Sequence, residues 1–163
     1  MTTDIAARSA TRPPAGPSRR RLLVALIVIG VAVPAVALGP IIWPPADLGV
    51  EPSAAQLGAL IALAVGDALF LGAGVAFLIF GYPVIRRVSP DSRLRAWSMY
   101  VAIGFVLVSW WPHLNMHASN GLDLAGLLVI DYVFHLPLEI AGVVLAVGVL
   151  SLLVERTGRR PAA

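Results

Sequence analysis

Histidines and carboxylates gather in one stretch of this sequence at spacings that suit metal coordination. All three histidines lie within it: His113, His117 and His135. Residues four apart share one face of an α-helix, so Asp131, His135 and Glu139 form one stripe and the two earlier histidines form another. Imidazoles and carboxylates that project from neighbouring helices are typical ligands of metal sites in helical bundles. The five residues are therefore predicted to bind a metal ion.

The available side chains narrow the choice of metal. The sequence has no cysteine, which excludes thiolate zinc sites, iron–sulfur clusters and thiol catalysis. Imidazoles with carboxylates suit a divalent or redox-active ion, with copper or iron favoured and zinc as a further choice. The spacing of Asp131 and His135 is similar to the copper-binding stretch in the membrane subunit of particulate methane monooxygenases. This resemblance covers those two positions, lacks the later histidine of that pattern, and implies only the type of ligand.

Each group of residues also has a structural interpretation. The pair His113 and His117 is compatible with a wet loop at a membrane interface. The Asp131–Glu139 stripe is compatible with a hydrogen-bonded seam that holds helices together. Asp67, in an earlier apolar run, is expected to be a polar partner of the other groups and not a ligand. Pro137 removes a backbone donor beside the stripe, which either widens the helix there or bends it.

The elements that carry these residues are expected to be membrane helices. The chain has 163 residues, 58% of them hydrophobic and 13% charged, whereas a soluble domain carries about 25% charged residues. Its long apolar runs predict an all-α polytopic membrane protein, a four-transmembrane-helix bundle with spans at about residues 22–43, 55–80, 94–111 and 122–154. Residues 1–20 are predicted to be a disordered cytoplasmic tail, 21–155 the transmembrane domain, and 156–163 a second cytoplasmic tail.

The distribution of basic residues predicts the orientation. All 12 are arginines, and they lie in three segments, residues 8–21, 86–95 and 156–160. The positive-inside rule places these segments, and hence both termini, on the cytoplasmic side of a multi-pass protein in the plasma membrane. This pattern is that of a membrane topology and not of a nucleic-acid surface. The expected partner is the lipid bilayer, with another membrane protein or a second copy of the chain as further candidates.

Ionisable groups inside the predicted spans require shelter from lipid. A charge at bilayer depth costs at least ~2.5–3.5 kcal/mol, so we expect Asp67, Asp131, His135 and Glu139 to point into the bundle. Small residues at every fourth position form ladders that predict close helix packing. These residues are Gly58, Ala62 and Gly66 in the second span, and Gly142 and Ala146 in the fourth. Haem between His117 and His135 is less favoured, because the outer side has no arginine to pair with propionates.

The leading hypothesis is a small integral membrane protein with a histidine and carboxylate metal site in the outer half of the bilayer, acting as an oxidase or oxygenase component. No catalytic residue is predicted, since the sequence contains no nucleophile elbow, phosphate-binding loop or zinc-protease helix. Two alternatives belong to other classes. One is a non-enzymatic accessory or structural subunit of a larger membrane complex. The other is a proton- or ion-conducting bundle that uses the intramembrane carboxylates.

Overall fold

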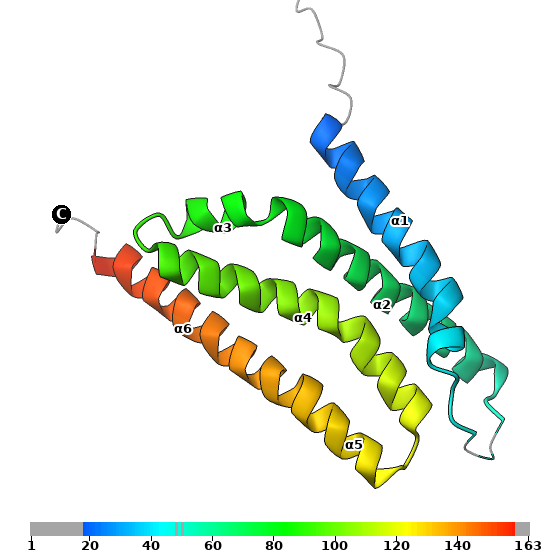
Figure 1. The fold of residues 1–163 in the computed structure, drawn as a ribbon. Coiled ribbons are helices and arrows are strands. Elements are labelled where there is room, and N and C mark those ends of the chain that lie inside the picture. Colours follow the sequence, from blue (N-terminus) through cyan, green and yellow to red (C-terminus); the bar gives the residue numbers. More distant parts are fainter. Residues whose placement is uncertain (1–17, 48, 50, 159–163) are drawn as a thin grey trace, which may run out of the picture.

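The structure is a computed structural model that describes residues 18–47, 49 and 51–158, and every regular element among them is helical (Figure 1). The first two long helices are α1 (Arg19–Ile42) and α2 (Ala54–Phe80). Residues 1–17 of the expected first tail and residues 159–163 of the second lie outside the described part of the chain. Helix α1 already includes the last two residues assigned to the first tail.

The second half of the chain forms a helical hairpin. A short helix, α3 (Tyr82–Val88), leads into α4 (Arg93–Asn120). The returning arm consists of α5 (Leu124–Ile130), a π-helical turn η1 (Asp131–His135) and α6 (Leu136–Gly158). Helix α4 continues through Pro112 to Asn120, so the segment after the predicted third span is helical and is not a loop.

Four helical segments are long and apolar enough to cross a membrane, as predicted: Arg19–Ile42, Ala54–Phe80, Arg93–Asn120 and Leu124–Thr157. Only between 11% and 28% of the most apolar window in each segment is buried within the chain. Exposed apolar area costs about 25 cal/mol per Å² in water, so lipid must solvate these surfaces. The four segments are those of a multi-pass membrane protein.

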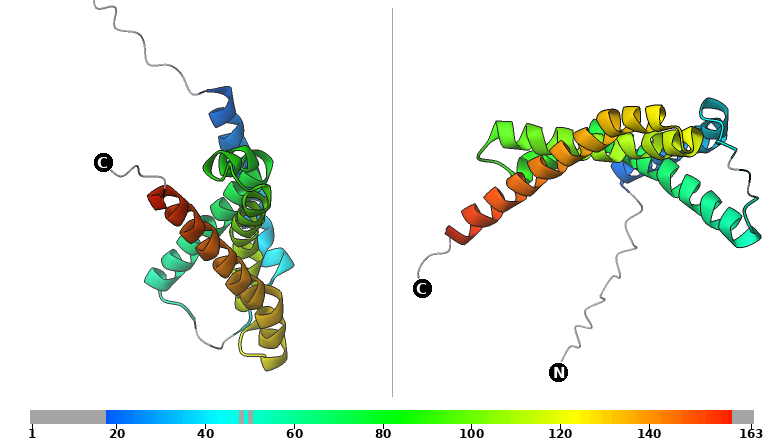
Figure 2. Two further views of the ribbon diagram at one scale, coloured as in Figure 1. Left: turned by 90° about the vertical axis from the view of Figure 1, so that its left-hand side faces the viewer. Right: turned by 90° about the horizontal axis from the view of Figure 1, so that it is seen from below.

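The long helices lie side by side in chain order as an open, curved layer. Helix α1 packs on α2, α2 on α4, and α4 on α6. Figures 1 and 2 show α1 and α6 as the two outer members of this layer. The expected closed bundle is therefore not what the described chain forms. As a consequence, α6 has a helical neighbour on its α4 side and leaves its other side exposed.

Glycines lie at the close contacts between helices in the layer. They are not the glycines of the predicted ladders. A Cβ at Gly72 would lie 2.4 Å from the backbone oxygen of Val28, so only glycine lets α1 and α2 approach this closely. Between α6 and α4, a Cβ at Gly148 would lie 2.8 Å from side-chain atoms of Met99. Three ladder glycines instead face open space: Gly58, Gly66 and Gly142. The prediction that these ladders pack the helices together was wrong for the described chain.

A set of polar contacts joins one end of α4 to the end of α6. Arg95 forms a two-point ion pair with Glu155, in which Nη2 and Oε2 are 3.0 Å apart. The Nε of Arg95 donates to the hydroxyl of the fully buried Ser89 at 2.8 Å, and Arg86 donates to the Ser89 carbonyl at 2.8 Å. We call these four residues the arginine clasp. It ties the loop after α3 to both arms of the hairpin.

Candidate metal centre

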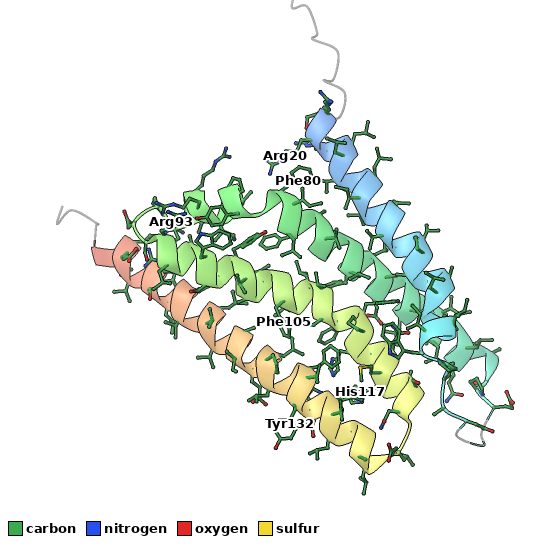
Figure 3. All side chains as sticks on the ribbon, in the orientation of Figure 1. Arg20, Phe80, Arg93, Phe105, His117 and Tyr132 are labelled. Carbon is green, nitrogen blue, oxygen red and sulfur yellow. The ribbon has the colours of Figure 1, made fainter. Side chains whose placement is uncertain are left out.

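The other end of the hairpin carries all three histidines. His113 and His117 project from consecutive turns of α4, and His135 is the last residue of η1. Their Nε2 atoms converge: His113 and His135 are 2.9 Å apart, His113 and His117 3.1 Å, and His117 and His135 3.4 Å. Figure 3 shows His117 on the side of α4 that faces the returning arm. We call this group the histidine cluster.

Hydrogen bonding among the imidazoles cannot account for this arrangement. The Nε2 of a neutral imidazole carries either a proton or a lone pair, so it acts as a donor or as an acceptor but not as both. Each hydrogen-bonded pair needs one donor and one acceptor. Three nitrogens in mutual contact cannot alternate in that way, so at least one pair is always mismatched. A cation on the side of the three lone pairs removes the mismatch, because it accepts electron density from all three.

The spacing of the nitrogens matches that of ligands sharing one ion. Two nitrogens bound at about 2.0–2.1 Å to one metal are about 2.9 Å apart at a right angle and about 3.4 Å apart at a tetrahedral angle. The observed distances run from 2.9 to 3.4 Å. An ion equidistant from the three atoms at that bond length would lie about 1 Å outside their plane. Its far side would remain open to further ligands.

Asp131 orients one member of the cluster. Its carboxylate accepts a hydrogen bond from Nδ1 of His135, four residues later in the chain. A proton on Nδ1 leaves the lone pair on Nε2, the atom that faces the other two histidines. A carboxylate behind a metal-binding imidazole is a common arrangement, because it fixes the tautomer and raises the basicity of the ligand.

Aromatic rings hold His113 in place. Its side chain is buried. The ring of Phe134 is stacked on it with the ring centroids 5.3 Å apart, and the ring of Trp110 meets it edge-on with the centroids 5.9 Å apart. Its Nδ1 has no hydrogen-bond partner in the described part of the chain. Packing rather than hydrogen bonding therefore sets the plane of this ring. No sequence pattern singled out Phe134; its position immediately before His135 was the available signal.

Local backbone features position the two arms. Helix α4 ends at Asn120, and its C-cap Gly121 has a φ of 58°, a conformation that favours glycine. Asp123 then caps α5 by accepting from the backbone N–H groups of Ala125 and Gly126. Further along, Pro137 lacks the N–H that an α-helix would use, and the preceding residues form the widened turn η1. Of the two effects considered for Pro137, widening is thus observed.

Three predicted site residues are not members of the cluster. Among the described residues, the three histidines are the only group of His, Asp and Glu side chains close enough to share an ion. Glu139 is exposed on α6, and Asp67 lies in a groove between α2 and α4, beside Trp110 and Asn115. Asp131 is also exposed, so the expectation of inward-pointing groups fails for Asp131 and Glu139. The reason is the open layer, in which the returning arm packs mainly against α4.

No protein-family model, curated protein or solved structure matches this chain.

Proposed function

We propose that this protein binds one metal ion in the membrane through the Nε2 atoms of His113, His117 and His135. The observation that carries the proposal is the convergence of three imidazole nitrogens within 3.4 Å of one another. A cation satisfies all three lone pairs at once, whereas hydrogen bonds among them cannot. Asp131 supports the site from behind His135 and is not a direct ligand in this proposal, and Glu139 and Asp67 have no part in coordination.

The donor set favours copper, with zinc next. Imidazoles bind copper and zinc well, and divalent copper forms the most stable complexes of the first-row series with a given set of nitrogen ligands. Non-haem iron sites of the oxygenase kind combine two histidines with a carboxylate ligand, and the carboxylate here is directed to the other nitrogen of His135. Haem is disfavoured, because axial histidines bind from opposite faces of the ring, while these three nitrogens converge on one point.

The arginine distribution supports a site in the outer half of the bilayer. Figure 3 shows Arg93 at one end of α4 and His117 toward the other. With the arginine segments in the cytoplasm, both termini are cytoplasmic and the histidine cluster lies near the opposite surface. Topology reporters fused after residue 20, at Arg93 and after residue 158 then report the cytoplasm, and one at Gly121 reports the outside. An extracytoplasmic signal at Arg93 would contradict this orientation.

Three protein ligands leave the ion open to a further ligand, which is what an oxidase or oxygenase component requires. We propose that role for the site, in which the three histidines would hold the ion and leave it able to take a further ligand. A second candidate, an accessory subunit of a larger membrane complex, is favoured by one observation. Glu139 is an exposed carboxylate on an apolar helix, and a partner protein or second copy that covers it would relieve its cost in lipid.

The test is the metal content of the purified full chain. Wild-type protein should take up one equivalent of copper or zinc in mild detergent, measured by elemental analysis after removal of free ion. His135→Ala should abolish this uptake and leave the helical content unchanged. Asn115→Ala is the matched control, since Asn115 lies between the other two histidines in sequence but donates to the Trp111 carbonyl. Wild-type protein that takes up neither ion overturns the proposal.

A further inference from the structure

We propose that Asp131 is a positioning residue of the histidine cluster that makes the site select divalent over monovalent ions. This inference rests on the proposed metal-binding function and deepens it by naming the charge class of the ion. Asp131 has two separate effects in this proposal: its hydrogen bond orients the His135 ring, and its negative charge favours a divalent ion.

The π-turn brings the acid and the ligand together. Asp131 and His135 are the first and last residues of η1, and the backbone N–H of Leu136 donates to the Asp131 carbonyl, five residues earlier. The Asp131 carboxylate meets Nδ1 of His135, while Nε2 of the same ring faces His113 and His117. The ring therefore lies between the carboxylate and the place where an ion would bind.

Charge gives the contact a second consequence. The three histidine ligands are neutral when they coordinate a metal. Within the described residues, Asp131 is the one acid that touches a member of the cluster. Coulomb attraction grows with the charge of the ion, so the carboxylate stabilises a divalent ion about twice as strongly as a monovalent ion at the same position.

No other charged side chain in the described chain competes for this role. Asp67 lies in the groove beside Trp110, Leu114 and Asn115, on a different face of α4. Glu139 is exposed on α6, and no hydrogen bond or ion pair joins it to a histidine of the cluster. The described arginines of the hairpin lie at the start of α4 and the end of α6, which is the end of the hairpin opposite the histidine cluster.

The experiment compares two ions and three variants of the full chain in lipid nanodiscs. Zinc is the divalent probe and silver(I) the monovalent probe, each titrated against a competing chelator. Asp131→Ala removes orientation and charge together. Asp131→Asn removes only the charge, because its amide oxygen still accepts a hydrogen bond from Nδ1. Glu139→Gln is the matched control, a carboxylate on the same arm that touches no histidine.

The expected results separate the two effects. Asp131→Ala should weaken zinc binding by about 10–100-fold, the usual effect of losing a residue that orients a ligand, and weaken silver(I) binding less. Asp131→Asn should weaken zinc binding by a smaller factor and weaken silver(I) binding less than zinc binding, because the lost Coulomb attraction is about half as large for the monovalent ion. Glu139→Gln should bind both ions as wild type does. If Asp131→Ala fails to fold, the zinc-to-silver ratio of Asp131→Asn still decides the question.

Two outcomes overturn this inference without touching the proposed function. In one, wild-type protein binds zinc and both Asp131 variants bind it equally well. In the other, the variants lose affinity for zinc and silver(I) by the same factor, which assigns Asp131 a structural role only. Wild-type protein that binds neither zinc nor copper instead overturns the proposed function, and this inference falls with it.

Discussion

The two ends of the α4 and α6 hairpin are joined by opposite kinds of chemistry. At the arginine clasp, Arg95 pairs with Glu155, and the guanidinium groups of Arg86 and Arg95 also donate to Ser89. Both guanidinium groups there meet acceptors from the same chain. At the histidine cluster, three like groups turn the same atom toward one point. The first set is complete in itself, and the second is suited to a cation.

The two ends thus differ as a polar group that holds helices together differs from one that could hold a metal ion. Both sets lie between the same two arms of the hairpin, and both contain an acid from the returning arm. In the clasp the acid neutralises a basic side chain directly. In the cluster the acid, Asp131, contacts one nitrogen of the His135 ring, and the other nitrogen of that ring faces the other two histidines. Complementarity within the chain, rather than polarity, distinguishes the two roles.

The largest expected difference between the two ends is their response to metal. A ligand present at 100 times its Kd stabilises the folded state by about 2.7 kcal/mol. Zinc or copper at that excess should raise the unfolding midpoint of wild-type protein and have no effect on His117→Ala. Thermal unfolding in detergent with and without a chelator measures this. Equal stabilisation of His117→Ala would show that the ion binds elsewhere.

Acidification should release metal from the histidine cluster and leave the arginine clasp unchanged, a smaller effect than that of adding metal. Protons compete with metal ions for imidazole nitrogens, so metal affinity falls as the pH falls, and bound metal is released. Elemental analysis of protein equilibrated at stepwise lower pH follows the release, and return to neutral pH should restore binding. The Arg95→Gln variant should release its metal over the same pH range, since the clasp takes no part in coordination.

Breaking the arginine clasp should produce the smallest of the three effects, and it should change stability without changing metal binding. Glu155→Gln weakens the ion pair with Arg95 and should lower the melting temperature by a few degrees while leaving metal content unchanged. A double variant, Arg95→Glu with Glu155→Arg, should recover part of that loss, because the pair is reversed and not removed. A drop in metal content with Glu155→Gln would mean that the clasp positions the histidines across the length of the hairpin.

Part of the site could be predicted from spacing alone. The four-residue intervals correctly indicated that His113 and His117 lie on one side of a helix and that Asp131 meets His135, because both follow from helical periodicity. The same reasoning placed Glu139 in the stripe, and the expectation that it points inward failed because it is exposed on α6. Periodicity shows which residues share a face, but it does not show whether another helix covers that face.

The glycines likewise show that spacing in the sequence does not reveal which face of a helix is packed. Gly142 belongs to an evenly spaced ladder and faces open space, whereas Gly72 and Gly148 belong to no predicted ladder and lie at helix contacts. A ladder shows that close approach is sterically possible. Which glycine is used depends on where the partner helix crosses, and a single sequence does not contain that information.

The sequence by itself determined that this is a helical membrane protein with four candidate spans, because apolar length and the need to satisfy backbone hydrogen bonds in lipid leave few other solutions. It also determined which atoms were available as metal ligands. Only the tertiary structure decided that the helices form an open layer, and that three histidines from two arms converge while Glu139 and Asp67 remain apart. Those outcomes depend on how α4 and the returning arm pack, and on a π-turn whose effect appears only in three dimensions.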